Sequence, residues 1–374
     1  MSWFRKRVIE LLGRADIRVD GERPWDIRVH DARFFRRAVV QGSLGLGESY
    51  MDGWWDCERL DDMFFRLLQA DIDKSVSDWH RAALSLRTRL FNLQSRTGAF
   101  QIGRRHYDLG EELFECMLDP QMIYSCGYWK DADNLAGAQR AKLNLVARKL
   151  GLKAGMRVLD VGCGWGGAVK YLAENHGVEA VGITVSEHQA QFARANAAEL
   201  PVDIRLEDYR DLPEKFSGHF DRVFSIGMFE HVGFRNYRRY FDVLRKCLKP
   251  DGLFLLHSIG RNTSATHTNP WIARYIFPRS NLPSVRQIGA ACEQLFVMED
   301  WHNFGADYDR TLLAWHENFE TRCQNLLSKY DERFRRMWRL YLLMSAAGFR
   351  ARRMQLWQLV LSPRGVAGGY NAPR

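Results

Sequence analysis

The sequence lacks the features of several large classes of protein. No apolar run approaches the ~18 residues of a transmembrane helix, and the first residues, MSWFRKR, do not lead into the apolar core of a signal peptide. We therefore expect no membrane span and a cytoplasmic location. The seven cysteines are an odd number without a Cys-x-x-Cys pair, which argues against a disulfide framework or a zinc site. We expect no metal, and most thiols should be small buried hydrophobes.

The composition is that of a globular protein with an uneven charge. The 374 residues are 46% hydrophobic and 26% charged, which fits ~2 domains. The net charge of +9 lies entirely in residues 321–374, where 11 basic residues face 2 acidic ones. Aromatics alternate with arginines in residues 333–339. This pattern suits a nucleic acid or an anionic membrane surface, or simply an amphipathic helix with a solvated basic face.

The chain divides by pattern into two domains. Residues 1–91 form one unit, the polar stretch 92–103 is the expected linker, and residues 104–374 form the second unit. In the first unit, residues 42–56 are rich in glycine and aromatics. They are not followed by Gly-Lys-Ser/Thr, so they are no phosphate-binding P-loop. We expect them to form turns that bring the aromatics together.

In the second unit, short apolar runs alternate with helical patterns. This alternation predicts an α/β fold with a doubly wound, mostly parallel sheet. The expected strands are 157–161, 180–184, 202–206, 220–226, 253–259 and 354–361, and the clearest helices are 111–118, 134–150 and 168–175.

A glycine-rich loop, VLDVGCGWGG at residues 158–167, follows the first of these strands and opens a helix. Its spacing fits a dinucleotide site, so NAD must be weighed against S-adenosylmethionine (SAM). NAD calls for an acid at the end of the next strand, but Thr184 stands there, with Gln189 nearby. Asp160 suits a cationic ligand, and the pair Asp208 and Tyr209 can bond and stack an adenine. These features favour SAM.

Two motifs that are absent from the sequence narrow the range of possible methyl acceptors. The chain has neither the Asn/Asp-Pro-Pro-Tyr/Phe motif of amino-methylating nucleic-acid enzymes nor a Pro-Cys nucleophile. Instead, Glu230 and His257 follow the fourth and fifth strands. Ligands bind outside the carboxyl ends of strands in such sheets, so both side chains should face the crevice that holds SAM.

Over almost its whole length the sequence resembles the cyclopropane-fatty-acyl-phospholipid synthases, a family of SAM-dependent methyltransferases. The resemblance rests on residues 42–56, 124–129, 158–167, 228–233, 270–278 and 300–309. It implies a Rossmann-like class I methyltransferase domain, preceded by a smaller, mostly helical N-terminal domain. It also implies methyl transfer to the cis double bond of a phospholipid acyl chain. A cyclopropane ring would then close through a carbocation that a bound bicarbonate deprotonates.

The resemblance also implies the site residues. Those expected around the bicarbonate are Cys126, Glu230, His257, the N–H of Ile259, and Tyr308. Those expected around SAM are Tyr124, Ser125, Asp160, Gly162, Cys163, Gly164, Trp165, Gly166, Gly167, Thr184, Gln189, Asp208 and Tyr209. Aromatic faces can stabilise a carbocation, and the candidates are Tyr124, Tyr128, Trp129, Phe229, Trp271, Tyr275 and Phe304; core packing is the alternative role of each.

The implied partner is a bilayer of phospholipids with unsaturated acyl chains, bound transiently at the inner face of the membrane. Aromatics beside arginines in residues 1–91, such as Trp3 and Phe4, suit a bilayer interface, although they can also build that domain's core. The resemblance further suggests a homodimer and no nucleic-acid partner. The alternatives are a methyl-branched product, a nucleic-acid methyltransferase and a non-catalytic SAM-binding protein.

Overall fold

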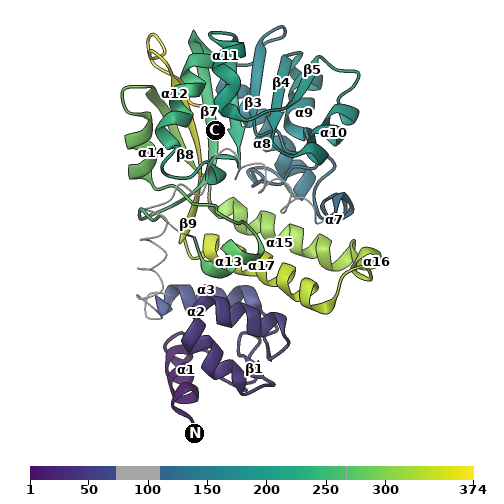
Figure 1. The fold of residues 1–374 in the computed structure, drawn as a ribbon, viewed down its shortest axis with the longest axis vertical. Helices are drawn as coiled ribbons and strands as arrows, with labels where there is room; N and C mark the ends of the chain where they lie inside the picture. The colour runs from purple at the N-terminus through teal and green to yellow at the C-terminus, as the bar shows by residue number, and fades with distance from the viewer. Residues whose placement is uncertain (73–109, 267) are drawn as a thin grey trace. The chain divides into compact units, whose positions relative to one another are not determined.

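A computed structural model describes residues 1–72, 110–266 and 268–374, and the chain forms two compact units within it (Figure 1). One unit combines Met1–Phe91, Thr266–Pro278 and Tyr308–Met354, and the other contains the remaining segments. The expected linker, residues 92–103, lies outside the described residues. The division of the chain into domains 1–91 and 104–374 stays a prediction.

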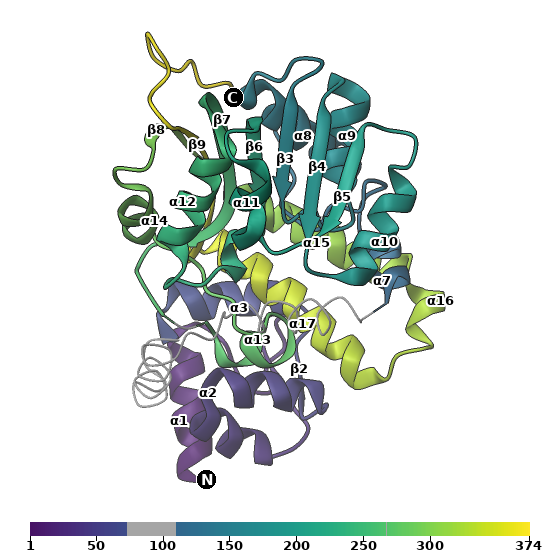
Figure 2. The same ribbon diagram turned by 45° about the horizontal axis from the view of Figure 1, so that its top comes forward.

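The larger unit is built on a seven-stranded sheet, which confirms the predicted α/β fold (Figure 2). Its strands lie in the order β5-β4-β3-β6-β7-β9-β8. The pairs β5–β4, β4–β3, β3–β6 and β6–β7 are parallel, and β8–β9 is antiparallel. The strands are β3 (Arg157–Val161), β4 (Glu179–Thr184), β5 (Val202–Leu206), β6 (Phe220–Ile226), β7 (Leu248–Arg261), β8 (Val297–Asn303) and β9 (Met354–Ser362).

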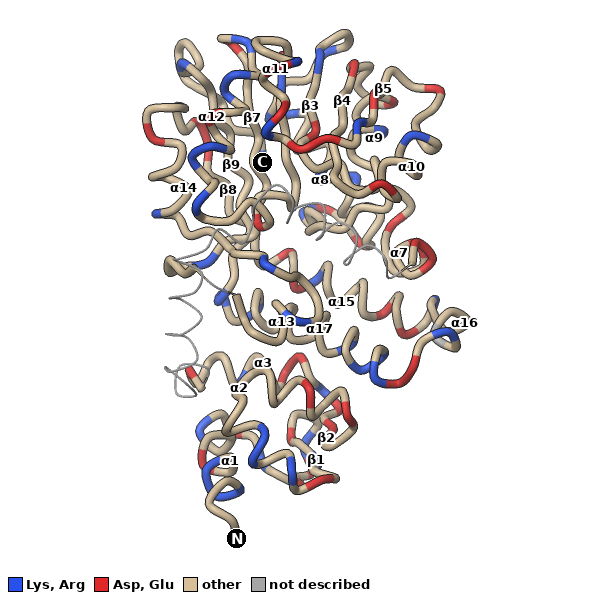
Figure 3. The backbone as a smooth tube through the Cα atoms, in the orientation of Figure 1, with Lys and Arg blue, Asp and Glu red and all other residues tan. Residues whose placement is uncertain are grey.

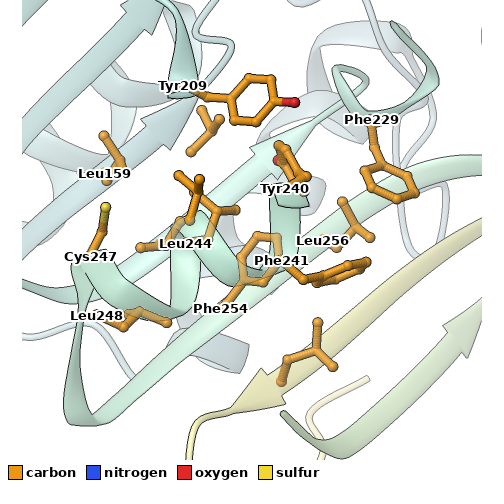
Figure 4. Packing of buried hydrophobic residues seen from close by; sticks show 14 of the residues in the cluster. Leu159, Tyr209, Phe229, Tyr240, Phe241, Leu244, Cys247, Leu248, Phe254 and Leu256 are labelled. Carbon is orange, nitrogen blue, oxygen red and sulfur yellow. The ribbon is translucent and has the colours of Figure 1, made fainter. Parts of the chain in front are cut away.

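Helices cover both faces of this sheet because successive strand residues point to opposite sides. Val223 faces one hydrophobic core, which includes α11, α12 and α14, whereas Phe224 faces the other, which includes α8, α9 and α10. Figure 4 shows the first core, where Tyr240 and Phe241 of α12 pack near Phe254 of β7. The helices are α7 (Glu111–Met117), α8 (Leu135–Leu150), α9 (Gly167–His176), α10 (Glu187–Asn196), α11 (Leu212–Phe216), α12 (Tyr237–Cys247) and α14 (Val285–Cys292), with 3₁₀ turns η1 (Tyr209–Asp211) and η2 (Phe229–His231).

The smaller unit is mostly helical. Its two strands form one short antiparallel pair, and α17 packs on α2 and α3. The elements are α1 (Trp3–Arg14), β1 (Arg28–Val29), α2 (Arg33–Met51), β2 (Trp55–Asp56), α3 (Leu60–Gln69), α13 (Pro270–Tyr275), α15 (Ala306–Thr321), α16 (Gln324–Leu327) and α17 (Glu332–Arg350).

The glycine-rich segment 42–56 differs from the expectation of turns, because α2 continues to Met51 across a kink at Gly42. One of its glycines, Gly47, lies where another helix approaches closely. A Cβ on Gly47 would lie 2.3 Å from Cδ1 of Trp271 on α13. The Trp271 indole N–H also donates to the sulfur of Met51 at 3.3 Å. Glycine at position 47 therefore makes room for the buried indole.

The basic face of α17 is engaged within its own unit. Figure 3 shows basic residues along α1, α2 and α17, and the α17 arginines pair with carboxylates from earlier segments. The pairs are Arg333–Asp52 at 3.0 Å, Arg336–Asp56 at 2.6 Å and Arg339–Glu320 at 2.8 Å. Much of the C-terminal positive charge is thus compensated internally. Over the described parts of the chain, no helix has the length and apolarity needed to cross a bilayer.

Candidate active site

A cavity opens at the carboxyl ends of β3, β4 and β6, where the predicted cofactor residues come together. The predicted residues that line it are Tyr124, Ser125, Asp160, Gly162, Cys163, Gly164, Trp165, Gly167, Thr184, Gln189, Asp208 and Tyr209.

Gly166 does not line this cavity and has a packing role instead. It adopts a left-handed φ of 82° at the start of α9, which glycine does without strain. A Cβ there would lie 2.7 Å from the Cβ of Ala193, so the missing side chain lets α9 and α10 approach each other. The neighbouring Gly162 and Gly164 also have positive φ, of 98° and 54°. The loop therefore presents bare backbone to the cavity.

Asp160 gives the cavity its chemical preference. The side chain is buried, its Oδ1 has no hydrogen-bond partner among the described residues, and burial raises its pKa well above the ordinary value. An ammonium or hydroxyl group of a ligand would satisfy this atom. At the end of β4, the Thr184 hydroxyl donates to Gln189 Oε1 at 3.0 Å. Bare glycine backbone, a buried acid and an amide fit SAM, which brings a sulfonium, an ammonium and ribose hydroxyls.

Asp208 and Tyr209 lie at the cavity, but both are already in contact with protein groups. One carboxylate oxygen of Asp208 accepts from the backbone N–H of Arg210 at 3.0 Å, and the other pairs with the Arg210 guanidinium at 2.7 Å. The Tyr209 ring meets Tyr240 edge-on at 5.1 Å. Their roles toward an adenine stay predictions.

Glu230 and Ile259 are in direct contact. Glu230 lies on η2, directly after β6, and its Oε1 accepts from the Ile259 N–H at 2.6 Å. This N–H was expected to hold the anion; here it holds the carboxylate, the nearest strong acceptor. Burial raises the pKa of Glu230 to about 7, although the Ile259 N–H opposes the shift. Glu230 Oε2 is buried and without a hydrogen-bond partner in the described part of the chain.

His257 follows the same pattern. It lies on β7, two residues before Ile259, and is 1% exposed. The Gln358 side-chain amide on β9 donates to its Nδ1 at 3.3 Å, so the ring proton belongs on Nε2. Burial, aided by Lys142, lowers its pKa well below the ordinary value, so the ring is neutral. Nε2 has no partner among the described residues. A neutral N–H donor and a free carboxylate oxygen fit a bicarbonate ion, which both accepts and donates.

Cys126 belongs to a segment that lies against these strand ends. A Cβ on Gly227, just after β6, would come within 3.9 Å of the Ser125 Cβ, and the Gly227 N–H donates to the His257 carbonyl at 3.0 Å. The Cys126 thiol is fully buried and donates to the Gly127 carbonyl at 3.1 Å. The expectation of buried thiols is confirmed for Cys126, Cys163, Cys247 and Cys292.

Tyr308, the fifth predicted residue of the anion site, belongs to the other compact unit. There its buried ring packs on Phe349 at 4.5 Å and on Trp315 at 6.0 Å. Its role in the site stays a prediction.

The predicted cation-stabilising aromatics separate into two groups. Phe304 meets the His257 ring at 5.8 Å and Tyr128 at 5.2 Å. Phe229 instead stacks on Tyr237 at 4.3 Å inside the core, and Trp271 packs within the smaller unit. Phe304 thus lies beside His257 with Tyr128 packed on it, whereas core packing accounts for Phe229 and Trp271.

Sequence reasoning missed the polar residues behind the site. Gln139 and Lys142 on α8 and Gln358 on β9 are each 0% exposed. A detectable signal existed, because all three occupy positions where the helical or strand period calls for an apolar residue. Lysine and glutamine are mostly exposed in proteins, and this hides such positions in a sequence.

The buried carboxyl of Glu230 makes stability depend on pH. Its pKa rises from 4.5 in the unfolded chain to about 7 in the fold, so the wild type loses stability as pH increases through this interval. We expect Glu230→Gln, which avoids this loss, to be more stable than the wild type at pH 8 by about 3 kcal/mol. Chemical denaturation at pH 4.5 and pH 8 would measure it. An equal difference at both pH values would contradict the assignment.

The fold and the cavity together define a class I SAM-dependent methyltransferase. The structure of the mycolic acid cyclopropane synthase CmaA1 with S-adenosylhomocysteine and CTAB is 30% identical, with a TM-score of 0.65 over 70% of this chain and 98% of that one. Coclaurine N-methyltransferase, at 19% identity and a TM-score of 0.68, shares the fold over 85% of this chain and 98% of its own.

Residues 94–359 match the family described as mycolic acid cyclopropane synthetase, and the chain belongs to this family. It is 52% identical to the cyclopropane-fatty-acyl-phospholipid synthase of Escherichia coli (strain K12), over all of this chain and 96% of that protein. It is 34% identical to the tuberculostearic acid methyltransferase UfaA1 of Mycobacterium tuberculosis, over 88% of this chain and 81% of that protein. The predictions of the family and of a SAM-dependent methyltransferase are confirmed.

Proposed function

We propose that this protein is a cyclopropane-fatty-acyl-phospholipid synthase. It transfers the methyl group of SAM to the cis double bond of an unsaturated acyl chain and then closes a three-membered ring. The observation that carries the proposal is a pair of buried atoms, Glu230 Oε2 and His257 Nε2, that have no hydrogen-bond partner among the described residues and lie beside a cavity suited to SAM. The full-length similarity to the Escherichia coli synthase supports the same substrate class.

The reaction balances as follows. One alkene carbon bonds to the SAM methyl carbon while the carbon–sulfur bond breaks, leaving S-adenosylhomocysteine and a carbocation on the lipid. The new methyl group then loses a proton, and its electron pair closes the ring. A bound bicarbonate would supply the base for this proton.

The residues of the chain supply position and environment. Glu230 would accept a hydrogen bond from the bicarbonate hydroxyl and so orient the ion, while the His257 Nε2–H would donate to another of its oxygens. Burial of both side chains keeps water away from the cation. Phe304, packed against His257, would present an aromatic face to the positive charge.

The acyl chains of the proposed substrate lie in a bilayer, which the protein must contact. Helix α1 has the composition of an interfacial helix. Trp3 is 66% exposed and Ile9 37% exposed. Residues 1–14 include four basic residues and one acid. Arg5 and Arg7 of α1 form ion pairs, as the α17 arginines do, so the exposed Trp3 and Ile9 are what favour α1 for contact with phospholipids. We propose transient binding at the inner face of the membrane; the homodimer stays a prediction.

We expect Trp3→Ser to lower binding to vesicles of anionic phospholipid by ~5-fold or more, because an exposed indole contributes strongly at the interface. Sedimentation with vesicles measures the bound fraction. Turnover on lipid dispersed in detergent should stay within ~2-fold of wild type, since α1 carries no site residue. Val40→Ser is the control, because Val40 lies on α2 and is 50% exposed. Trp25→Ser would not serve, because the Arg66 guanidinium lies over that ring. Unchanged vesicle binding by Trp3→Ser would exclude α1 as the helix that contacts the membrane.

The proposed activity is tested by product mass. The purified chain is incubated with SAM and vesicles of mono-unsaturated phospholipid, with and without bicarbonate, and the released fatty acids are analysed. A gain of one CH₂ with loss of the double bond supports cyclopropanation. A gain of one CH₂ with the double bond retained supports a methyl-branched or methylene-branched product, the second candidate. It is favoured by the 34% identity to a named fatty acid methyltransferase. No mass change would contradict both.

A further inference from the structure

Lys142 is a fully buried lysine beside the proposed site. It lies on α8, its side chain is 0% exposed, and its Nζ donates to the Ser125 hydroxyl at 2.7 Å. Within the described residues it forms no ion pair. Lys149, two turns later on the same helix and equally buried, does form one, with Asp300 at 3.0 Å. Burying an ammonium costs several kcal/mol. No adjacent carboxylate among the described residues offsets this cost for Lys142, which suggests that its charge has a function.

The surroundings of Lys142 place it behind the segment that carries Cys126. Gln139, one helical turn earlier, donates to the Ser125 carbonyl at 2.8 Å and the Ile123 carbonyl at 3.3 Å. The Tyr128 N–H donates to the Ala138 carbonyl at 2.9 Å. The first half of α8 therefore fixes the segment from Ile123 to Tyr128 by side-chain and backbone bonds. Only Lys142 adds a charge to this support.

The positive charge of Lys142 acts on residues of the cofactor cavity and of the predicted bicarbonate site. On the cofactor side it opposes the rise of the Asp160 pKa. At His257, both Lys142 and Lys149 add to the effect of burial in lowering the pKa. The titratable groups that act on Lys142 in return are Asp119, Cys126 and Asp160. Burial lowers its own pKa to about 8, so it is largely cationic at neutral pH.

We propose that Lys142 is a positioning residue whose ammonium orients the segment of Ser125 and Cys126 and supplies the positive charge that allows bicarbonate to bind beside Glu230. This proposal rests on the proposed function. A buried anion next to a carboxylate is repelled, and His257 is neutral. Because Phe304 and the Ile259 N–H bring no net charge, the nearby cation is what offsets that repulsion.

The test compares wild type, Lys142→Met and Lys149→Met as full-length proteins in bicarbonate-depleted buffer. Sodium bicarbonate is titrated in the presence of S-adenosylhomocysteine while the thermal unfolding temperature is followed, and the half-saturating bicarbonate concentration is measured in turnover. We expect Lys142→Met to lose the bicarbonate-induced rise in unfolding temperature and to need at least ~10-fold more bicarbonate.

Lys149→Met is the matched control, because it also removes a buried lysine from α8 but leaves Asp300 paired with Arg374. Because Lys149 also acts on His257 but bonds to Asp300 and His302 and not to Ser125, its bicarbonate response should fall by less than that of Lys142→Met. If Lys142→Met does not fold, Lys142→Gln, which keeps a donor near Ser125 but no charge, should show the same loss. A wild-type bicarbonate response in a folded Lys142 variant would overturn the proposal alone. No bicarbonate response in the wild type would overturn the bicarbonate base as well.

Discussion

Glu230→Gln should reduce turnover by ~10²–10⁴-fold, the usual contribution of a positioned acid–base group. The amide keeps an oxygen that can accept from the Ile259 N–H, so the local backbone should hold its place. The –NH₂ group of the glutamine cannot accept a hydrogen bond from the bicarbonate hydroxyl, so the orientation of the base is lost. Single-turnover measurement with saturating SAM and vesicles would report the chemical step directly.

SAM affinity should be nearly unchanged in Glu230→Gln, because Glu230 does not line the cofactor cavity. Calorimetry with SAM checks this. Glu299→Gln is the control: Glu299 accepts from Ser362 and Val366 at the far strands of the sheet, away from the site. A wild-type rate in Glu230→Gln, with the control also at the wild-type rate, would remove Glu230 from the mechanism.

Gly167→Ala should weaken SAM binding by at least ~10-fold, through overpacking rather than loss of a contact. An added Cβ would lie 1.7 Å from the carbonyl oxygen of Gln121. That carbonyl cannot easily retreat, because the Asp119 carboxylate accepts from the N–H groups of Gln121 at 3.0 Å and Ile123 at 3.1 Å. The segment from Gln121 to Ser125, which forms one wall of the cavity, must shift instead. Calorimetry with SAM and with S-adenosylhomocysteine measures the loss.

Gly289→Ala is the matched control for this substitution. Gly289 lies in α14, and a Cβ there would meet nothing within 4 Å. We expect unchanged SAM affinity and a slight gain in stability, since alanine is the better helix former. If both variants bound SAM like the wild type, the wall at Gln121 would be more compliant than its hydrogen bonds indicate.

Sequence alone located most of the sheet because buried parallel strands are short apolar runs between turn signals. The predicted limits of β3, β5 and β6 match the structure residue for residue. β8 escaped notice because it is an edge strand, with Glu299, Asp300 and His302 among its residues and only partial burial. Such a run has neither a continuous apolar stretch nor a clean alternation.

The sequence predicted the site residues that follow strand ends. It did not predict the buried helix residues that hold the site's segments in place. Glu230 and His257 follow strand ends, and parallel topology brings such ends to one edge. Lys142 supports the site from the middle of a helix, 17 residues after the Ser125 that it contacts. The helical period places Lys142 on the buried face of α8, but only the packing of α8 shows that its ammonium reaches Ser125.

The smaller unit joins the first 91 residues to segments that end at Met354, and this has a consequence for synthesis on the ribosome. The faces of α2 and α3 that pack on α17 must wait for about 260 further residues to be made, which takes ~13–50 s at ~5–20 residues per second. During that interval the nascent N-terminal helices expose apolar surface. We therefore expect newly made chains to depend on chaperones that hold exposed segments until translation is nearly complete.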